Sequence, residues 1–382
     1  MSDYYRLDRI LKEQADFNLI VGERGNGKTY AMQEYLLKER LINGGQCVWL
    51  RRWMDDVKAS NAQNFWDGLL VAQIEKLSGG RYQGIELKAS RYYLCSYDQK
   101  GKAIYNDNDI LGYVTDVNEA ERLKGQSFPR VTNIVYEEFI SLSQMGYIPD
   151  ETVLFDNIIS TIVRDRTNVK IWMLGNTINP YNPYFIKYGI RGLNLKQGDI
   201  WTRTNGYGGK LAVEFCPKRR KGSMVGTSAK YFGFEDSSGN TDMILGNGWQ
   251  LPDVPTLPYP SRDVLKLRIP IIFDMKVIEM SLFYNSKHHA HFIWVRLATD
   301  DDLDNPIQFV NKRYGKKCYV LYNIPQMANN FYTAISKLPI ESSSLLQKLK
   351  DCFIHEKIWY EDKWTASYFN NFIGITEKTK WA

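Results

Sequence analysis

A glycine-rich pattern near the start of the chain constrains the fold more than any other feature. Residues 22–29 read Gly-Glu-Arg-Gly-Asn-Gly-Lys-Thr and fit Gly-x4-Gly-Lys-Ser/Thr without deviation. The apolar run 17–21 before them predicts a buried strand, and the apolar spacing over 29–40 predicts a helix after them. A strand, a glycine-rich loop and a helix in this order predict an α/β fold with a phosphate-binding loop.

Each residue type in this loop suits the binding of phosphate groups. Glycines let backbone N–H groups turn toward phosphate oxygens, and the helix that follows presents its positive end. Lys28 adds a mobile cation, and the hydroxyl of Thr29 is a ligand for Mg2+. We therefore expect ATP and Mg2+ as cofactors. The expected nucleotide-binding residues are Gly22, Arg24, Gly25, Asn26, Gly27, Lys28 and Thr29.

A second apolar strand, 133–136, ends in the carboxylates Glu137 and Glu138. This is the place of a Walker B element, whose first acidic residue supports Mg2+ and whose adjacent Glu polarises the attacking water. Taken alone, the pair is also typical of a solvated strand end. We assign Glu137 to the metal and Glu138 to the base. Asp is commoner than Glu at the first position, so this division of roles stays open.

Two further groups are candidates for contact with the γ-phosphate. Asn176 ends the apolar strand that begins at residue 170, where an amide would sense phosphate or the lytic water; the alternative is a polar turn before Pro180. Arg164 and Arg166 follow the helical pattern of 150–163 and are candidate transition-state cations. The alternative is that they are solvated or satisfy the end of that helix.

Apolar strands and helical patterns alternate through the first part of the chain. Residues 47–50 predict a short strand, and the alternation over 81–97 predicts antiparallel hairpins inserted between the parallel strands. Together with the three strands already described, this favours a mostly parallel sheet flanked by helices.

The texture changes after about Val213, where Gly, Ser, Lys and Pro accumulate and predict a linker. Strand-like and then helical patterns resume beyond it, at 269–273, 277–284, 291–296, 318–322 and 345–372. We therefore expect an ATPase domain over 1–215, a linker over 216–260 and a smaller C-terminal domain over 261–382.

Several function classes are disfavoured. The longest apolar runs are far shorter than the roughly 18 residues of a membrane span, and residues 1–17 lack the apolar core of a secretory signal, so we expect a cytoplasmic protein without a membrane. The five cysteines form no Cys-x-x-Cys pair, which favours reduced thiols. His288, His289 and His291 lack a spaced carboxylate or Cys, and Asp300–Asp302 with Asp304 are more typical of a turn than of a nuclease metal cluster.

The combined motifs resemble one family, the DNA-packaging motor ATPases of phi-twenty-nine-type tailed bacteriophages. The phosphate loop alone is generic. The specific features are Arg-Arg-Trp at 51–53, Glu-Phe-Ile at 138–140 and Asn-Pro-Tyr-Phe at 182–185. The resemblance covers about residues 5–195 and extends only loosely over the C-terminal part.

The resemblance implies an additional-strand, catalytic-glutamate P-loop ATPase, followed by an RNase H-like domain that has lost its nuclease metal site. It implies a homo-oligomeric ring, a pentamer, at the portal (connector) vertex of an empty prohead in the cytoplasm of the infected bacterial host. Each ATP hydrolysed would drive double-stranded DNA inward, with a structural packaging RNA bridging motor and capsid. By position, Glu137 would support Mg2+, Glu138 would be the base and Asn176 the sensor, while Arg164 and Lys124 would act on the neighbour's ATP.

Two alternatives stay open. One is an ATP-binding scaffold that does not hydrolyse, prompted by Glu137; the other is a different ring NTPase acting on nucleic acid without packaging. The net charge of +6 permits a nucleic-acid partner without requiring one. Residues 218–221, Lys-Arg-Arg-Lys, are the candidate nucleic-acid contact outside the ATPase core, with a solvated linker as the alternative.

Overall fold

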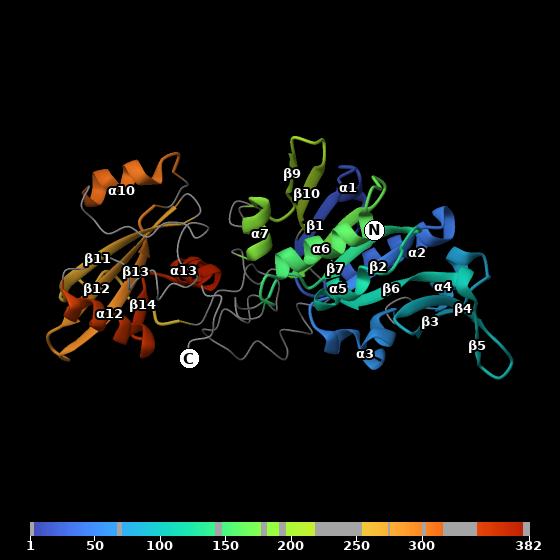
Figure 1. Ribbon diagram of the computed structural model, residues 1–382, viewed down its shortest axis with the longest axis horizontal. Coiled ribbons are helices and arrows are strands. Elements are labelled where there is room, and N and C mark those ends of the chain that lie inside the picture. Colours follow the sequence, from blue (N-terminus) through green and yellow to red (C-terminus); the bar gives the residue numbers. More distant parts are fainter. Residues whose placement is uncertain are drawn as a thin grey trace.

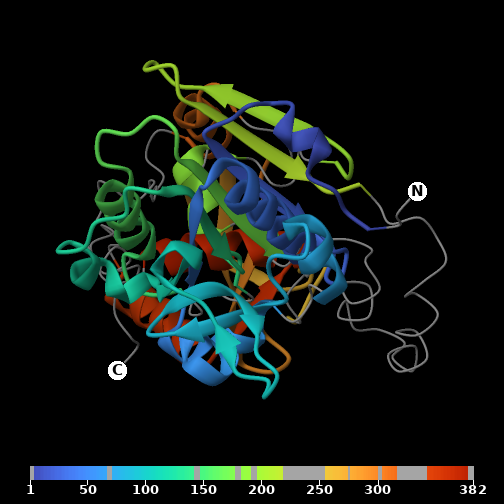
Figure 2. The ribbon, with the colours of Figure 1, turned by 90° about the vertical axis from the view of Figure 1, so that its right-hand side faces the viewer.

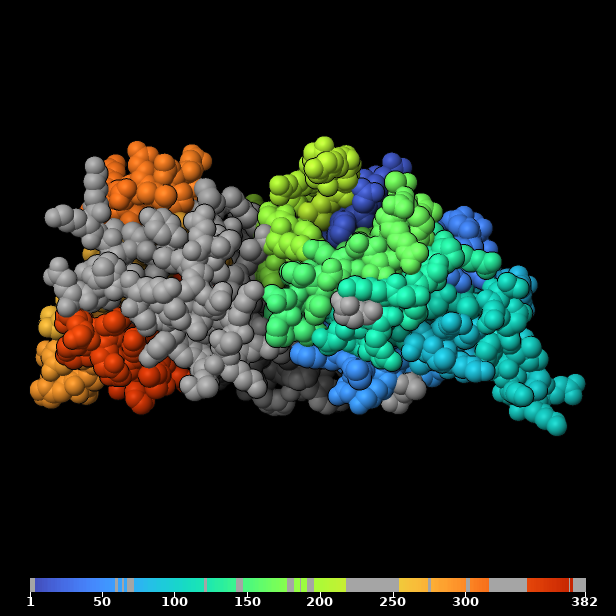
Figure 3. Space-filling view, in the orientation of Figure 1, coloured from blue at the N-terminus to red at the C-terminus, as the bar shows by residue number. Residues whose placement is uncertain are grey.

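The computed structural model describes residues 4–66, 71–141, 147–176, 182–190, 196–217, 254–273, 276–299, 303–315 and 342–376. These residues form a ten-stranded and a four-stranded sheet, which lie toward opposite ends of the long axis (Figure 1). In the space-filling view, the blue to green N-terminal residues lie at one end and the orange to red C-terminal residues at the other (Figure 3). No helix in the described part of the chain has the length and hydrophobicity that a membrane crossing requires. The predicted strand at 318–322, the basic run 218–221 and Asp300–Asp302 fall outside the described residues.

The large sheet is mixed but mostly parallel, as predicted. Its order is β3-β4-β6-β2-β7-β8-β1-β10-β9, with β5 paired to β4. The strands from β6 through β10 in this order run parallel, and β3, β4 and β9 are antiparallel additions. The strands are β1 (Phe17–Gly22), β2 (Gln46–Arg51), β3 (Gly84–Lys88), β4 (Arg91–Tyr97), β5 (Ala103–Ile104), β6 (Ile110–Asp116), β7 (Val131–Glu137), β8 (Lys170–Asn176), β9 (Ile200–Thr204) and β10 (Lys210–Phe215).

Helices cover both faces of this sheet (Figure 2). Successive residues of a strand point to opposite faces, so Ile20 of β1 joins one core cluster while Leu19 and Val21 join the other. Burial on both faces explains why the central strands read as continuous apolar runs. The first face packs α1 (Asp8–Leu11), α2 (Lys28–Asn43), α3 (Ala59–Gln63) and α4 (Val71–Ser78), and the second packs α5 (Ala120–Leu123), α6 (Glu151–Val163) and α7 (Pro183–Tyr188).

The small sheet follows the predicted strands of the C-terminal part. Strands β11 (Val264–Phe273), β12 (Lys276–Asn285) and β13 (Ala290–Leu297) are antiparallel, and β14 (Ile358–Tyr360) adds in parallel beside β13. The helical tail is confirmed as α12 (Ser343–Ile354) and α13 (Lys363–Thr376), which pack on one face, whereas α10 (Pro306–Tyr314) packs on the other. Each sheet thus has its own apolar core among the described residues.

Candidate nucleotide-binding site

The carboxyl ends of neighbouring parallel strands bring the predicted residues to one edge of the large sheet. Gly22 at the end of β1 is in register with Asn176 at the end of β8, and Glu137 ends β7 on the far side of β8. A pocket of about 390 Å³ opens at this edge. Its lining includes residues 24–29, Glu137, Glu138 and Asn176. Residues that are far apart in the sequence therefore meet around one cavity.

The loop between β1 and α2 has the backbone that its glycines predict. Gly25 and Gly27 adopt φ values of +71° and +94°, the left-handed region that side chains with a Cβ rarely enter. A Cβ on Gly22 would lie 2.6 Å from Asn26 Nδ2 and 2.7 Å from Cys216 Cβ, so no larger residue fits there. Gly27 caps the start of α2 without any side-chain hydrogen bond to the helix. The N–H of Lys28 donates to Asn26 Oδ1 at 3.2 Å, and the positive end of the helix is suited to phosphate oxygens.

Lys28 is buried within the loop. Its Nζ donates to the carbonyl oxygens of Gly22 at 3.1 Å and Glu23 at 2.8 Å. It also donates to Oδ1 of Asn26 and Oδ1 of Asn176, each at 3.2 Å. Burial lowers the pKa of the Lys28 ammonium to about 8, although nearby acidic groups such as Glu137 favour the charged form. A phosphate group would offer this buried cation a charged partner.

Thr29 and Glu137 meet at the floor of the pocket. Thr29 Oγ1 donates to Glu137 Oε1 at 2.5 Å, and Arg51 Nη1 lies 2.8 Å from Glu137 Oε2. Burial raises the pKa of the Glu137 carboxyl, while Arg51 and Thr29 act in the opposite direction. A hydroxyl and a carboxylate are the hard oxygen ligands that Mg2+ prefers, so this pair fits the expected metal.

Glu138 lies at the mouth of the pocket with an unusual backbone. Its side chain is 51% exposed, and Arg51 Nη2 is 3.0 Å from its Oε2. Its φ of +56° places a non-glycine residue in the left-handed region, a conformation that costs energy and that the surrounding structure must hold. A solvent-accessible carboxylate beside the buried Glu137 is suited to the part of a base toward water.

Arg164 and Lys124, by contrast, do not line this pocket. The Arg164 guanidinium donates to the carbonyls of Thr161 at 3.3 Å and Gln126 at 2.9 Å, at the end of α6. Its φ is +48°, again in the left-handed region. Lys124 is exposed in the turn after α5. The contact with Gln126 therefore joins the end of α6, which carries Arg164, to the turn after α5, which carries Lys124. Neither cation lines the pocket of its own chain.

Arg166, like Arg164, makes helix-end contacts of the kind that the structural alternative predicted. Its guanidinium donates to the carbonyls of Val131 at 2.6 Å and Pro129 at 3.2 Å, and also to Ile162. These bonds tie the end of α6 to the start of β7. Arg166 therefore satisfies carbonyl groups of its own chain.

Sequence reasoning missed Arg51 and Arg52 as site residues. Arg51 contacts both acidic residues of the site, and Arg52 donates to the backbone carbonyls of Glu138 and Phe139. The available signal was two consecutive arginines at the end of an apolar strand. Their function follows only from the pairing of β2 with β7, which the sequence pattern does not reveal.

Within the described ranges, no group of three His, Cys, Asp or Glu residues is arranged to hold a metal ion. His289 Nδ1 instead lies 3.2 Å from the hydroxyl of Tyr284. The described cysteines, Cys47, Cys95, Cys216 and Cys352, are buried free thiols.

Comparison with known proteins supports the resemblance drawn from the motifs. The family described as "Podovirus DNA encapsidation protein (Gp16)" matches residues 1–224. The "DNA packaging protein" of Bacillus phage B103 is 29% identical over 220 residues, which cover 56% of this chain and 58% of the relative. That of Bacillus phage phi29 is 27% identical over 230 residues, covering 57% and 59%. The chain thus spans just under three-fifths of the length of the curated relatives it matches.

A solved structure extends the likeness in fold to the rest of the chain. The structure titled "The Phi-28 gp11 DNA packaging Motor" covers the whole of both chains with a TM-score of 0.55 at 16% identity, which shows the fold alone. The family match is of a different kind, because it follows the sequence over more than half of the chain and includes the phosphate loop, Glu137, Glu138 and Asn176. On this match, the chain belongs to the Podovirus DNA encapsidation protein (Gp16) family.

Proposed function

We propose that this chain is the ATP-hydrolysing subunit of a motor that moves double-stranded viral DNA into a preformed prohead. The observation that carries the proposal is the convergence of Lys28, Thr29, Glu137, Glu138 and Asn176 on one pocket. A scaffold that merely bound nucleotide would not need an accessible carboxylate beside the metal ligands. Membership of a DNA encapsidation family supports the proposal that hydrolysis drives DNA packaging.

The residues of the pocket divide the chemistry among them. The backbone N–H groups of residues 24–28 and the Lys28 ammonium bind the β- and γ-phosphates. Thr29 and Glu137 would hold Mg2+, which would supply positive charge to the phosphate oxygens. Glu138 orients the attacking water and accepts its proton. Asn176 shares its Oδ1 with Lys28, so a γ-phosphate that draws the ammonium away also frees the amide to report on the phosphate.

Arg164 and Lys124 complete the site of a neighbouring subunit. Both lie outside the pocket of their own chain, and the bond from Arg164 to Gln126 links the segments that carry them. An arginine supplied in trans stabilises charge that develops on the γ-phosphate. This arrangement requires a ring, which we propose to be a homopentamer.

The chain divides into parts with different tasks. We propose a P-loop ATPase domain of the additional-strand, catalytic-glutamate type over 1–215, a linker over 216–260 and an RNase H-like domain without nuclease activity over 261–382. The separate apolar cores of the two sheets support this division. The antiparallel β11–β13 meander with helices on both faces is compatible with the proposed C-terminal fold.

The proposed partners follow from the task. The ring would bind the portal of the prohead, with a structural RNA between motor and capsid, in the cytoplasm of the infected bacterium. A packaging assay with purified procapsids, DNA, ATP and Mg2+ tests the whole proposal. We expect nuclease-resistant DNA with the wild-type chain and none with Lys28→Ala. DNA-stimulated phosphate release without packaging would favour another ring NTPase, and no phosphate release would favour the scaffold.

A further inference from the structure

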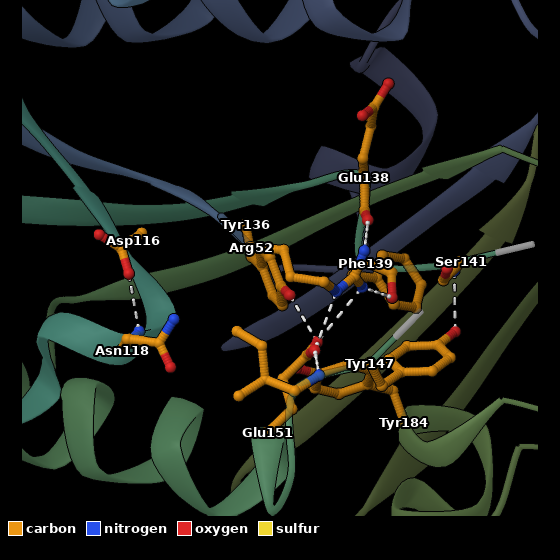
Figure 4. A network of polar contacts seen from close by, with 11 residues as sticks. Arg52, Asp116, Asn118, Tyr136, Glu138, Phe139, Ser141, Tyr147, Glu151 and Tyr184 are labelled. Carbon is orange, nitrogen blue, oxygen red and sulfur yellow. Dashed lines mark hydrogen bonds and ion pairs between the residues drawn. The ribbon is translucent and has the colours of Figure 1, made fainter. Parts of the chain in front are cut away.

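A buried ion pair contacts the backbone at Glu138 and Phe139, the two residues that follow β7 (Figure 4). It joins Arg52, just after β2, to Glu151, the first residue of α6. Arg52 Nε is 2.9 Å from Glu151 Oε2, and Arg52 Nη2 donates to Glu151 Oε1 at 3.2 Å. The two side chains are only 8% and 2% exposed. The pair is thus two-pronged and shielded from water.

The remaining donors of Arg52 bind the main chain at the proposed base. Arg52 Nη1 donates to the carbonyl of Glu138 at 3.1 Å, and Nη2 donates to the carbonyl of Phe139 at 2.7 Å. Glu138 has a left-handed backbone, which persists only where the surroundings hold it. These two hydrogen bonds are contacts that hold it.

Glu151 is itself fixed from three sides. It accepts hydrogen bonds from the hydroxyl of Tyr136 at 2.5 Å, the hydroxyl of Tyr184 at 2.8 Å and the backbone N–H of Ile148 at 2.9 Å. With the two bonds from Arg52, the carboxylate oxygens have partners from β7, α7 and the approach to α6. The guanidinium therefore has one well-defined position.

We propose that Arg52, fixed by Glu151, is a positioning residue that sets the direction of the Glu138 carboxylate for hydrolysis. Arg51 and Arg52 hold the same two-residue stretch in different ways, since Arg51 contacts side-chain carboxylates and Arg52 contacts backbone carbonyls. A buried ion pair adds little net stability over an apolar pair of similar size. The geometry that the pair imposes on the Glu138 and Phe139 carbonyls is therefore the effect to test. The inference rests on the proposed hydrolysis of ATP.

The first test removes both charges together, so that neither is left buried without a partner. In Arg52→Met/Glu151→Gln, the glutamine still offers an oxygen to the two tyrosines, while the contacts to the Glu138 and Phe139 carbonyls are lost. We expect kcat for ATP hydrolysis to fall by about tenfold to a hundredfold. KM and the Kd of a fluorescent ATP analogue should stay close to wild type. The unfolding temperature should fall, because the N–H of Ile148 and the carbonyls of Glu138 and Phe139 lose their partners. A folded double variant with wild-type kcat would overturn the inference.

The matched control lies in the small sheet. Glu279 is fully buried there, with Arg296 Nη2 at 2.9 Å and the hydroxyl of Tyr314 at 2.7 Å from its Oε2. Arg268 Nε also lies 3.0 Å from Glu279 Oε1. Arg296→Met/Glu279→Gln therefore removes the same kind of pair far from the pocket but leaves a second arginine, which is 35% exposed. It should leave kcat for ATP unchanged, and an equal loss in this control would show that removal of any buried pair has the same effect.

The decisive test repeats the substitution in a Glu138→Gln background. If Arg52 acts through Glu138, the residual single-turnover rate of Glu138→Gln should not fall further when the pair is removed. Losses that multiply would show a general structural role and overturn the inference. Should the double variant fail to fold, Arg52→Lys can be compared in the wild-type and Glu138→Gln backgrounds instead. Lysine keeps a cation beside Glu151 but cannot contact both carbonyls. A wild-type chain without DNA-stimulated hydrolysis would instead refute the proposed function.

Discussion

The hydroxyl of Thr29 donates a hydrogen bond to Oε1 of Glu137 across 2.5 Å, although the two residues belong to α2 and β7. At the metal-binding position of a Walker B element aspartate is commoner than glutamate, so the reach of the Glu137 side chain matters. The contact shows that the longer side chain reaches the hydroxyl with which it would share Mg2+. Its other oxygen is engaged by Arg51, so the carboxylate has a fixed direction.

We expect Glu137→Gln to weaken the use of Mg2+ more than the binding of nucleotide. Loss of the carboxylate charge removes the main anionic ligand and the partner of Arg51. The free Mg2+ concentration for half-maximal hydrolysis should rise about tenfold or more. A titration of ATPase activity against Mg2+ measures this, with Glu138→Gln as the control. If only Glu138→Gln shifts the Mg2+ midpoint, the two roles must be exchanged.

Glu138→Gln should keep nucleotide affinity but lower the rate of hydrolysis by about a hundredfold or more, because the amide cannot accept the proton of water. The substitution preserves side-chain size at a half-exposed position, so folding should be unaffected. Single-turnover hydrolysis and equilibrium binding of an ATP analogue separate the two effects. Wild-type turnover by this variant would assign the base to another residue.

ATP affinity should fall as the pH rises through about 8. Burial lowers the pKa of Lys28 to about 8, so below this value the ammonium is charged and binds phosphate, and above it the neutral amine does not. Bound phosphate favours the charged form, and binding above pH 8 should therefore take up a proton. Calorimetry in buffers with different ionisation enthalpies measures the uptake. Lys28→Arg, which stays charged, should bind with a flat profile over the same range.

The sequence pattern was sufficient for the central strands and the loop. Residues 17–29 carry a buried strand, positive-φ glycines and a helix start within one short segment, so local chemistry determines the structure. Strand β6, residues 110–116, was not predicted, and the predicted hairpins ended at residue 97. In space, β6 lies parallel to β2 and the hairpin β3–β4 extends the sheet beyond it.

The candidate site was predicted where its residues occupy motif positions, and missed where function depends on strand order. Glu137 and Asn176 each end a strand that the sequence predicts, and Glu138 follows Glu137 directly. Arg51 and Arg52 become site residues only because β2 lies beside β7, a strand that follows it much later in the chain. Long-range pairing of this kind is not encoded in the local periodicity of either strand.

A fragment ending at residue 217 should fold alone and bind ATP with nearly the affinity of the whole chain. It contains every strand of the large sheet, and it keeps Cys216, whose N–H donates to the carbonyl of Val21 at 2.7 Å beside the phosphate loop. Circular dichroism and analogue binding test both points. The fragment should fail in packaging, and full packaging by it would refute a division of tasks between the two parts.

Arg164 provides the test of action between subunits. Its guanidinium is bound to the carbonyls of Thr161 and Gln126 and does not line its own pocket, so it should act on ATP held by the adjacent subunit.

We expect Arg164→Ala to leave nucleotide affinity nearly intact and to lower DNA-stimulated hydrolysis by about a thousandfold, the usual contribution of an arginine in trans. Arg122→Ala is the control, because Arg122 is a nearby arginine that is 77% exposed and paired only with Glu119 at 2.8 Å among the contacts described. Mixing Arg164→Ala with Lys28→Ala should restore some hydrolysis, since a mixed ring contains junctions where an intact loop faces an intact arginine. Monomeric wild-type chain should hydrolyse slowly. Two outcomes would contradict the prediction: the monomer hydrolyses ATP as fast as the ring, or the two variants never complement over the mixing series. Arg164 would then act within its own chain or only bind the carbonyls at the end of α6.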